Sequence, residues 1–229
     1  MLKTRAFRVD SINMKSIMIN NTHHHRAALF DLDGVIIDTE GIYSGFWSTI
    51  DERFPTGIPH FAQAIKGMNL QEILGNHFPT PIQPQVQQML MEFQSDMKYE
   101  YFPGAMDFVR MLHNAGFAVA IVTSSDQHKM NELYRQHPDF EPTFDVIITG
   151  DMVTRAKPHP ECYKLAARLA CTELQDCIVF EDSVNGLKAG LASGAKVVGL
   201  TTTYSVDVVK PLCHVMVDSL SNLTLDMLP

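Results

Sequence analysis

Two aspartates, Asp31 and Asp33, end a short apolar run and are followed directly by Gly34. The run itself, residues 27–32, is typical of a buried strand. Along an extended chain, the first carboxylate could attack phosphorus while the second serves as general acid and base for the leaving group and for water. Gly34 would let the backbone turn away without placing a side chain in the site. An EF-hand also begins with alternating acidic residues, but the apolar residues that follow here do not supply that loop's later ligands.

Three further groups of polar side chains lie at or just beyond the ends of apolar runs. Thr123 closes the run that starts at residue 117, and Lys157 lies past the run that ends near residue 149. Glu181 and Asp182 close a third run. Taken singly, each group has an ordinary explanation as a strand-end hydroxyl, a solvated lysine or a helix cap. Because ligands bind beyond the carboxyl ends of the strands in open α/β sheets, their joint position favours one shared site.

The chemistry of this set is that of phosphoryl transfer. Clustered carboxylates repel one another and need a cation, and a site built from oxygen ligands favours Mg²⁺. A hydroxyl and an ammonium group beside them suit phosphoryl oxygens. We therefore expect Mg²⁺ as the cofactor and a small phosphorylated molecule as the substrate.

Helical and strand patterns alternate after residue 102. Helices are expected over 103–116, 126–137, 159–171 and 184–194, and strands over 117–125, 144–151, 177–183, 196–202 and 214–218. Continuous apolar strands that alternate with amphipathic helices indicate an α/β fold, a Rossmann-like three-layer core with a central parallel sheet. Residues 40–101 have a mostly helical pattern, so a helical insert follows the first strand.

The composition limits the classes of function. A formal net charge of -8 over 229 residues argues against a general nucleic-acid binder. No run approaches the ~20 apolar residues of a membrane helix, and the first 25 residues lack the apolar segment of a secretory signal. The four cysteines show no Cys-x-x-Cys spacing, which favours reduced thiols. We expect a cytoplasmic monomer that binds neither nucleic acid nor a membrane.

Four segments resemble, in order and spacing, the motifs of the haloacid dehalogenase superfamily of phosphotransferases. They are FDLDGVIIDTE from residue 30, IVTSS from residue 121, KPHPECY from residue 157 and VFEDSVNGLKAGLASG from residue 179. The helical insert resembles the small cap of the β-phosphoglucomutase-like branch. The domains expected from this resemblance are an N-terminal extension (1–25), a catalytic core (26–39 and 102–229) and a helical cap (40–101).

The resemblance also implies roles for individual residues. Asp31 is the expected nucleophile and a Mg²⁺ ligand, and Asp33 is the expected acid and base, with its backbone carbonyl on the metal. Asp182 is expected to bind the ion, with Glu181 beside it or acting through water. Thr123 and Lys157 would hold the phosphoryl group, and Lys157 would also keep Asp31 ionised. The further expected substrate contacts are Gly34 and Ser124 in the core and Tyr43, Lys66 and Asn69 in the cap, whereas Trp47 is more typical of cap packing.

The choice between a hydrolase and a mutase depends on the cap. β-Phosphoglucomutases of this branch carry a histidine four residues after the threonine of the first motif, where this chain has Tyr43. They also carry a cap arginine after a Lys-Gly pair, where this chain has Met68, Asn69 and Leu70. A mutase must hold a doubly phosphorylated intermediate, so a missing cation disfavours it. We expect a Mg²⁺-dependent phosphomonoester hydrolase that acts on a small metabolite, a sugar phosphate, through an aspartyl phosphate. A β-phosphoglucomutase and a non-catalytic binding protein remain the alternatives.

Overall fold

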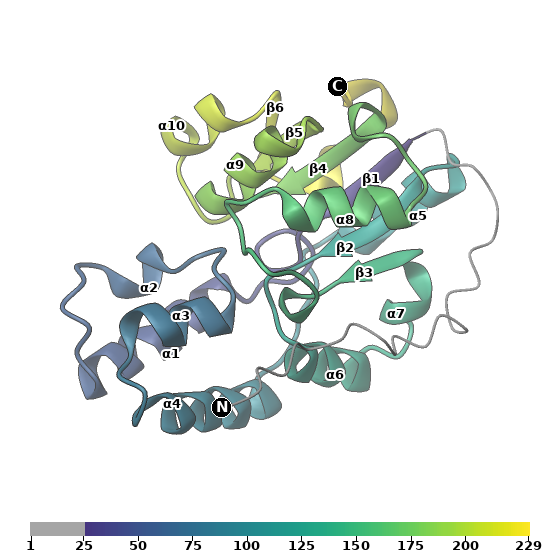
Figure 1. The fold of residues 1–229 in the computed structure, drawn as a ribbon. Helices are drawn as coiled ribbons and strands as arrows, with labels where there is room; N and C mark the ends of the chain where they lie inside the picture. The colour runs from purple at the N-terminus through teal and green to yellow at the C-terminus, as the bar shows by residue number, and fades with distance from the viewer. Residues whose placement is uncertain (1–25) are drawn as a thin grey trace, which may run out of the picture.

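A six-stranded parallel sheet forms the centre of the molecule (Figure 1). The computed structural model describes residues 26–229, and the expected N-terminal extension lies outside this range. The strand order is β3-β2-β1-β4-β5-β6, which places the first strand in the middle of the sheet. The strands are β1 (Ala27–Phe30), β2 (Ala118–Val122), β3 (Val146–Ile148), β4 (Cys177–Glu181), β5 (Lys196–Leu200) and β6 (Val215–Val217).

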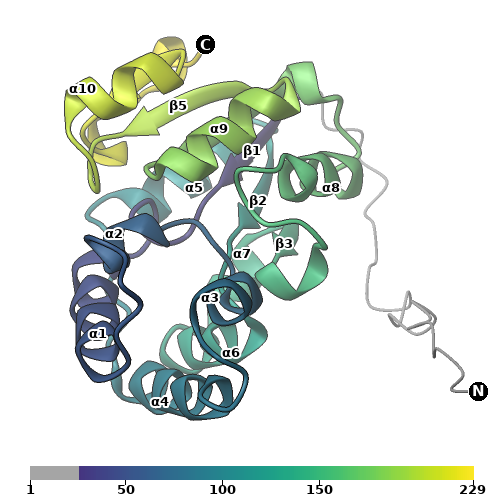
Figure 2. The same cartoon turned by 60° about the vertical axis from the view of Figure 1, so that its left-hand side comes forward.

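Helices cover both faces of the sheet, because the central strands are apolar on both sides. Ala28 and Phe30 of β1 face one apolar cluster, while Ala27 and Leu29 face another. The first cluster includes side chains of α5 (Ala105–Asn114), α6 (Gln127–Gln136) and α7 (Phe140–Thr143), and the second those of α8 (Glu161–Leu169), α9 (Val184–Ser193) and α10 (Val206–Val209). Figure 2 shows α8 and α9 in front of the central strands. The expected three-layer α/β core is therefore confirmed.

The segment between β1 and α5 is helical and packs around its own apolar cluster. Its helices are α1 (Glu40–Arg53), α2 (Phe61–Ala64), α3 (Leu70–His77) and α4 (Gln83–Asp96). Trp47, Ile50, Phe61, Val86 and Leu90 are among the buried residues of this cluster. Helix α4 lies against α6 of the core, so the helical segment, called the cap below, is held over the carboxyl edge of the sheet (Figures 1 and 2).

The strands are shorter than the apolar patterns predict. β2 ends at Val122, because the polar residues that follow leave the sheet and lead into α6. Asp126 begins α6 by accepting a hydrogen bond from the backbone N–H of Lys129. Ser183 begins α9 in the same way, at the backbone N–H of Gly186. Within residues 26–229, no helix combines the length and apolarity that crossing a membrane requires.

Candidate active site

A tight turn after β1 places the first two acidic residues. The backbone N–H of Asp31 donates to the carbonyl of Phe180 at 2.9 Å, which fixes it beside β4. Gly34 has a φ of 78° and its N–H donates to the carbonyl of Ile37 at 2.9 Å, which closes the turn. A Cβ atom at this glycine would lie 2.1 Å from Oδ2 of Asp182. Glycine is therefore required here both for the backbone conformation and for the space that Asp182 occupies.

Lys157 joins two of the strand ends through its buried ammonium group. Its Nζ donates to Oδ1 of Asp31 at 2.6 Å, to Oε1 of Glu181 at 2.6 Å and to the carbonyl of Val122 at 3.0 Å. The side chain is 2 % exposed. An ammonium group has three N–H bonds, so Lys157 has no donor left for another group in this arrangement. Its direct role is to hold the carboxylate of Asp31 in place and to offset its charge.

Glu181 is fully buried and its carboxylate oxygens are occupied. Oε1 accepts from Lys157 and, at 3.0 Å, from the hydroxyl of Tyr163. Oε2 accepts from the backbone N–H groups of Asp182 and Ser183 and from the hydroxyl of Ser183. These contacts shape the loop between β4 and α9 and orient Lys157. They leave Glu181 less free to bind an ion than its neighbour Asp182.

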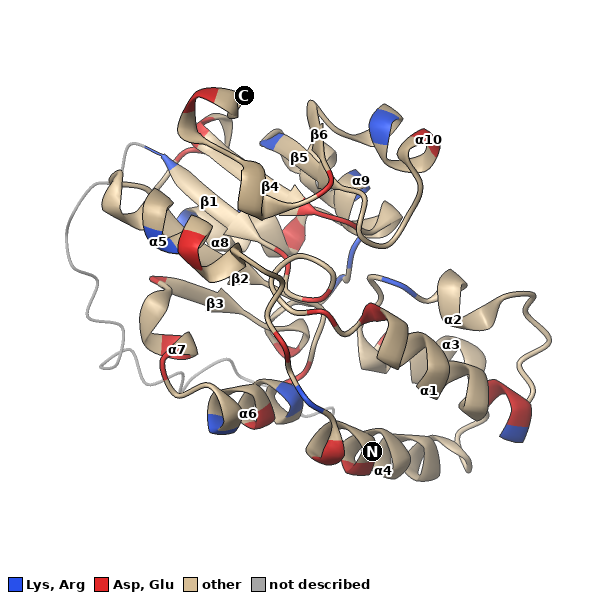
Figure 3. Cartoon of the chain, turned by 180° about the vertical axis from the view of Figure 1, so that it is seen from behind, with Lys and Arg blue, Asp and Glu red and all other residues tan. Residues whose placement is uncertain are grey.

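Asp182 is the third buried acid at this edge of the sheet. It is 1 % exposed, and among the described residues neither of its side-chain oxygens has a hydrogen-bond partner, as is also true of the nearby Thr203 hydroxyl. One carboxylate oxygen from each of Asp31, Glu181 and Asp182 lies within 4.8 Å of the others. Figure 3 shows acidic segments gathered at this edge of the sheet, facing the cap.

Burial and mutual repulsion act on the protonation of these acids. Burial raises the pKa of Asp31 to about 7, although Lys157 lowers it. Burial, followed by the charges of Glu181 and Asp31, holds the pKa of Asp182 well above its usual range. A divalent cation would relieve both effects, and an all-oxygen donor set is the kind that Mg²⁺ prefers. The residues therefore fit a magnesium site made by Asp31 and Asp182.

Asp33 is held by donors from three different segments. Its Oδ1 accepts from the Thr39 hydroxyl and from the Lys129 ammonium group, and its Oδ2 accepts from the Ser125 hydroxyl at 3.0 Å. Burial raises the pKa of Asp33, but the charge and hydrogen bond of Lys129 outweigh it and hold the pKa below its usual value. The Lys129 Nζ also lies 4.3 Å from the centre of the Tyr43 ring, a cation–π contact that links this ion pair to the cap.

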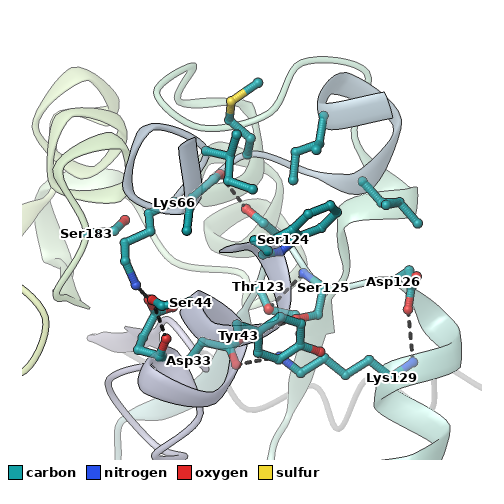
Figure 4. Close-up of a pocket in the computed structure, with 18 of the residues that line it drawn as sticks. Asp33, Tyr43, Ser44, Lys66, Thr123, Ser124, Ser125, Asp126, Lys129 and Ser183 are labelled. Carbon is teal, nitrogen blue, oxygen red and sulfur yellow. Dashed lines mark hydrogen bonds and ion pairs between the residues drawn. The ribbon is translucent and has the colours of Figure 1, made fainter. Parts of the chain in front are cut away.

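A cavity opens between these core residues and the cap (Figure 4). Thr123 lines its floor and is 3 % exposed, and its Oγ1 accepts from the Ser125 N–H at 3.0 Å, which leaves the hydroxyl proton free to donate. Ser124 also lines the cavity, but its hydroxyl donates to the Gly67 carbonyl at 2.8 Å and so joins the core to the cap. The arrangement can hold a phosphoryl group beside Asp31, with the rest of a substrate directed toward the cap.

Comparison with known proteins decides the family. The model of haloacid dehalogenase-like hydrolases matches residues 28–200. The chain belongs to the haloacid dehalogenase-like hydrolase family. It is 28% identical over 192 residues to validoxylamine A 7'-phosphate phosphatase from Streptomyces hygroscopicus subsp. limoneus, covering 80% of this chain and 89% of that protein. It is also 28% identical over 183 residues to hexitol phosphatase A from Escherichia coli, covering 75% of this chain and 81% of that protein.

The fold is shared with solved structures. One of them, from Bacteroides vulgatus, carries the provisional name β-phosphoglucomutase. It has a TM-score of 0.72 and 23% identity, and the match covers 88% of this chain and 87% of that one. The structural likeness shows the shared fold, whereas the match of the family to residues 28–200 and the phosphatase relatives confirm the expected family and enzyme class.

Most of the predicted site residues of this hydrolase come together. Asp31, Asp33, Thr123, Ser124, Asp182, Tyr43 and Lys66 all line the cavity, and Lys157 and Glu181 contact its lining. Trp47 lines it too, while remaining packed in the cap cluster. Lys66 is already ion-paired with Glu40.

Two predicted substrate contacts of this hydrolase are not in the cavity lining. Asn69 caps α3 by accepting from the Glu72 N–H at 2.9 Å. Gly34 has its carbonyl occupied by the Thr202 hydroxyl at 2.6 Å, and its N–H is used within the turn. Both residues shape the site's surroundings in this structure, and their contact with substrate stays a prediction.

Sequence reasoning missed the groups that hold the predicted residues in place. Lys129, Thr39 and Ser125 bind Asp33, and Tyr163 binds Glu181. Thr39, Ser125 and Tyr163 lie inside the first, second and third family-like motifs, so their position was an available signal. Lys129 lies within helix α6, where a lysine is ordinary, and only the packing of that helix brings it to the site.

Proposed function

We propose that the protein is a Mg²⁺-dependent phosphomonoester hydrolase that acts on a small phosphorylated metabolite through an aspartyl phosphate at Asp31. The observation that carries the proposal is the arrangement around Lys157, which holds the carboxylate of Asp31, while neither oxygen of nearby Asp182 has a hydrogen-bond partner within residues 26–229. Two relatives bear names of phosphatases that act on phosphorylated small molecules, which supports the same reaction class here.

The proposed first step transfers the phosphoryl group to the protein. Asp31 attacks phosphorus in line, a bond forms between its carboxylate oxygen and phosphorus, and the bond to the leaving oxygen breaks. Asp33 must carry a proton at this step, although Lys129 favours its carboxylate form, and it gives that proton to the leaving oxygen, so the leaving group departs as a neutral alcohol. The Thr123 hydroxyl is free to donate to a phosphoryl oxygen, and Lys157 keeps Asp31 oriented for attack.

The second step releases phosphate. Asp33, now a carboxylate held by Thr39, Ser125 and Lys129, takes a proton from water as the water oxygen attacks phosphorus. The bond between phosphorus and Asp31 breaks, which returns the carboxylate to its starting state. Asp31, Asp182 and the backbone carbonyl of Asp33 would hold Mg²⁺, which supplies positive charge for the oxygens of the transferring group.

Phosphate release from a panel of phosphorylated metabolites tests the proposal. With Mg²⁺, the protein should release phosphate from at least one sugar or polyol phosphate, and Asp31→Asn should lower kcat by at least about 1000-fold. Incubation with β-glucose 1-phosphate and a trace of the bisphosphate separates hydrolysis from isomerisation. Accumulation of glucose 6-phosphate without free phosphate would replace the hydrolase with a mutase, and no turnover of any compound would remove the enzymatic proposal.

A further inference from the structure

The side chain of Gln94, in the last turns of α4, reaches the cavity with one polar atom unpaired. Gln94 is 3 % exposed and lines the same cavity as the core carboxylates. Its Nε2 donates to the Tyr43 hydroxyl at 3.2 Å, whereas its Oε1 has no hydrogen-bond partner among the described residues. If the two ends of the amide were exchanged, the nitrogen would lack a hydrogen-bond partner in place of the oxygen. Either orientation therefore leaves one polar atom of the amide unpaired.

A buried amide end without a partner is unfavourable unless a ligand supplies one. Gln94 belongs to the lining of a cavity that also contains the reacting carboxylates, and its unpaired amide end is buried there. A hydroxyl group is the simplest ligand group that fits, because it can donate to an amide oxygen and can accept from an amide nitrogen. The cap therefore offers a binding position for a hydroxyl of the leaving group.

The charges around the cavity argue against an anionic leaving group. Five carboxylates line the cavity, from Asp31, Asp33, Glu40, Asp126 and Asp182, against the two ammonium groups of Lys66 and Lys129. Each ammonium group already has a carboxylate partner: Glu40 pairs with Lys66, and Asp33 pairs with Lys129. Figure 4 shows the two lysines reaching the site from different elements, with Tyr43 against Lys129. A second phosphate would have to displace one of these carboxylates.

The remaining lining suits an uncharged molecule with both polar and apolar surfaces. Ser44, Ser124, Ser125 and Ser183 line the cavity, and each hydroxyl donates within the protein but keeps an oxygen that can accept. Tyr43 and Trp47 provide an apolar side. Carbohydrates and polyols present this combination, with hydroxyl groups at the edge and C–H groups on the face.

We propose that Gln94 binds a hydroxyl of an uncharged, polyhydroxylated leaving group, and so selects such monophosphates over simple alkyl phosphates and over bisphosphates. This inference rests on the proposed phosphatase activity and assigns the source of its specificity. Gln94 acts by hydrogen bonding to the leaving group and takes no part in proton or phosphoryl transfer.

The test compares substrates that differ by one hydroxyl. Phosphate release with Mg²⁺ is measured for sugar and hexitol monophosphates, the corresponding bisphosphates, and propyl and hexyl phosphate. The preferred monophosphate is then compared with each of its monodeoxy analogues. We expect at least one analogue to lose about 10- to 100-fold in kcat/KM with the natural protein, because it leaves the amide of Gln94 unpaired.

Gln94→Met should remove that difference by lowering kcat/KM for the parent compound only. The matched control is Gln85→Met, the same change at an exposed position of the same helix, which should keep the difference. Gln94→Asn, which keeps the amide but withdraws it, provides a second variant and should also reduce the difference. Tyr99 donates to the backbone carbonyl of residue 94, so this buried contact survives in all these variants.

The charge argument is tested separately with Glu40→Gln, which frees Lys66. We expect this variant to raise the ratio of kcat/KM for bisphosphates to that for monophosphates by about 10-fold or more. An unchanged hydroxyl preference in both Gln94 variants, or a bisphosphate as the preferred substrate of the natural protein, would overturn the inference. If Glu40→Gln leaves the ratio of kcat/KM for bisphosphates to that for monophosphates unchanged, the inference that the cavity charges disfavour bisphosphates is wrong. Absence of phosphate release from every compound would instead refute the phosphatase activity on which the inference rests.

Discussion

Replacing Lys157 with methionine should destabilise the protein in a way that depends on pH. The change removes three hydrogen bonds and leaves the buried carboxylates of Asp31 and Glu181 without a cation. Breaking a buried ion pair by removing one partner costs about 3–5 kcal/mol. For a protein of this size, each kcal/mol lowers Tm by about 2–4 °C. Lys157→Met should therefore unfold about 6–20 °C below the natural protein in EDTA at pH 8.

The sign of the pH dependence follows from the raised pKa of Asp31. Burial raises this pKa from 3.8 to about 7 in the folded protein, with Lys157 opposing the rise. A carboxyl group with a raised pKa stabilises the folded state most at low pH, and the stabilisation is lost as pH rises through the folded pKa. Without Lys157, the pKa rises further. The difference in Tm between the two proteins should be small near pH 5 and large at pH 8.

Thermal unfolding followed by circular dichroism in EDTA at several pH values measures this effect. Lys164→Met, at an exposed position of α8, is the matched control and should unfold within about 1 °C of the natural protein. The reasoning is refuted if Lys157→Met unfolds at the natural temperature at pH 8, or if its deficit is largest at pH 5. Its kcat should also fall by at least about 100-fold at pH 7, because Asp31 would be protonated and unanchored.

Three other substitutions address the rest of the site. Asp182→Asn should keep or raise Tm in EDTA, since it removes a buried acid without a hydrogen-bond partner among the described residues. The same variant should lose the rise in Tm that Mg²⁺ causes in the natural protein. If Mg²⁺ still raises the Tm of the variant, Asp182 is not a ligand of the ion. Gly34→Ala should lower both the activity and the rise in Tm on addition of Mg²⁺, because the new Cβ would lie 2.1 Å from Oδ2 of Asp182. Normal kinetics of this variant would contradict the close approach of Gly34 and Asp182. Lys129→Met should lower kcat by about 10- to 100-fold with a smaller change in KM, since Asp33 loses its only ammonium partner among the described residues. Steady-state kinetics measure both constants, and a change in KM alone would argue that Lys129 acts in substrate binding.

The sequence allowed the polar cluster at the carboxyl edge of the sheet to be predicted because the relevant signals are local. Asp31, Thr123 and Asp182 each end or follow an apolar strand, and parallel strands bring their carboxyl ends together. The strand order then places Asp31 between the other two. Lys157 follows the same logic from a loop near the sheet's edge.

The cap side of the site was less predictable, because it depends on how separate helices pack. Lys129 is 96 residues from Asp33, and its position in an amphipathic helix is typical of a solvated lysine. Gln94 lies in an amphipathic cap helix, where a glutamine is ordinary, and the sequence gives no signal of its unpaired amide. Asn69 shows the opposite case, because an asparagine three residues before Glu72 is a local capping signal that explains it without a substrate.

The central claim is that Asp31 accepts the phosphoryl group, and trapping that intermediate tests it most directly. The natural protein, mixed with Mg²⁺ and its preferred substrate, is quenched in acid within milliseconds, digested with pepsin and analysed by mass spectrometry. We predict a phosphoryl group on Asp31 that disappears at longer times and is absent from Asp31→Asn. A phosphoryl group found on another residue, or undiminished turnover by Asp31→Asn, would contradict the account.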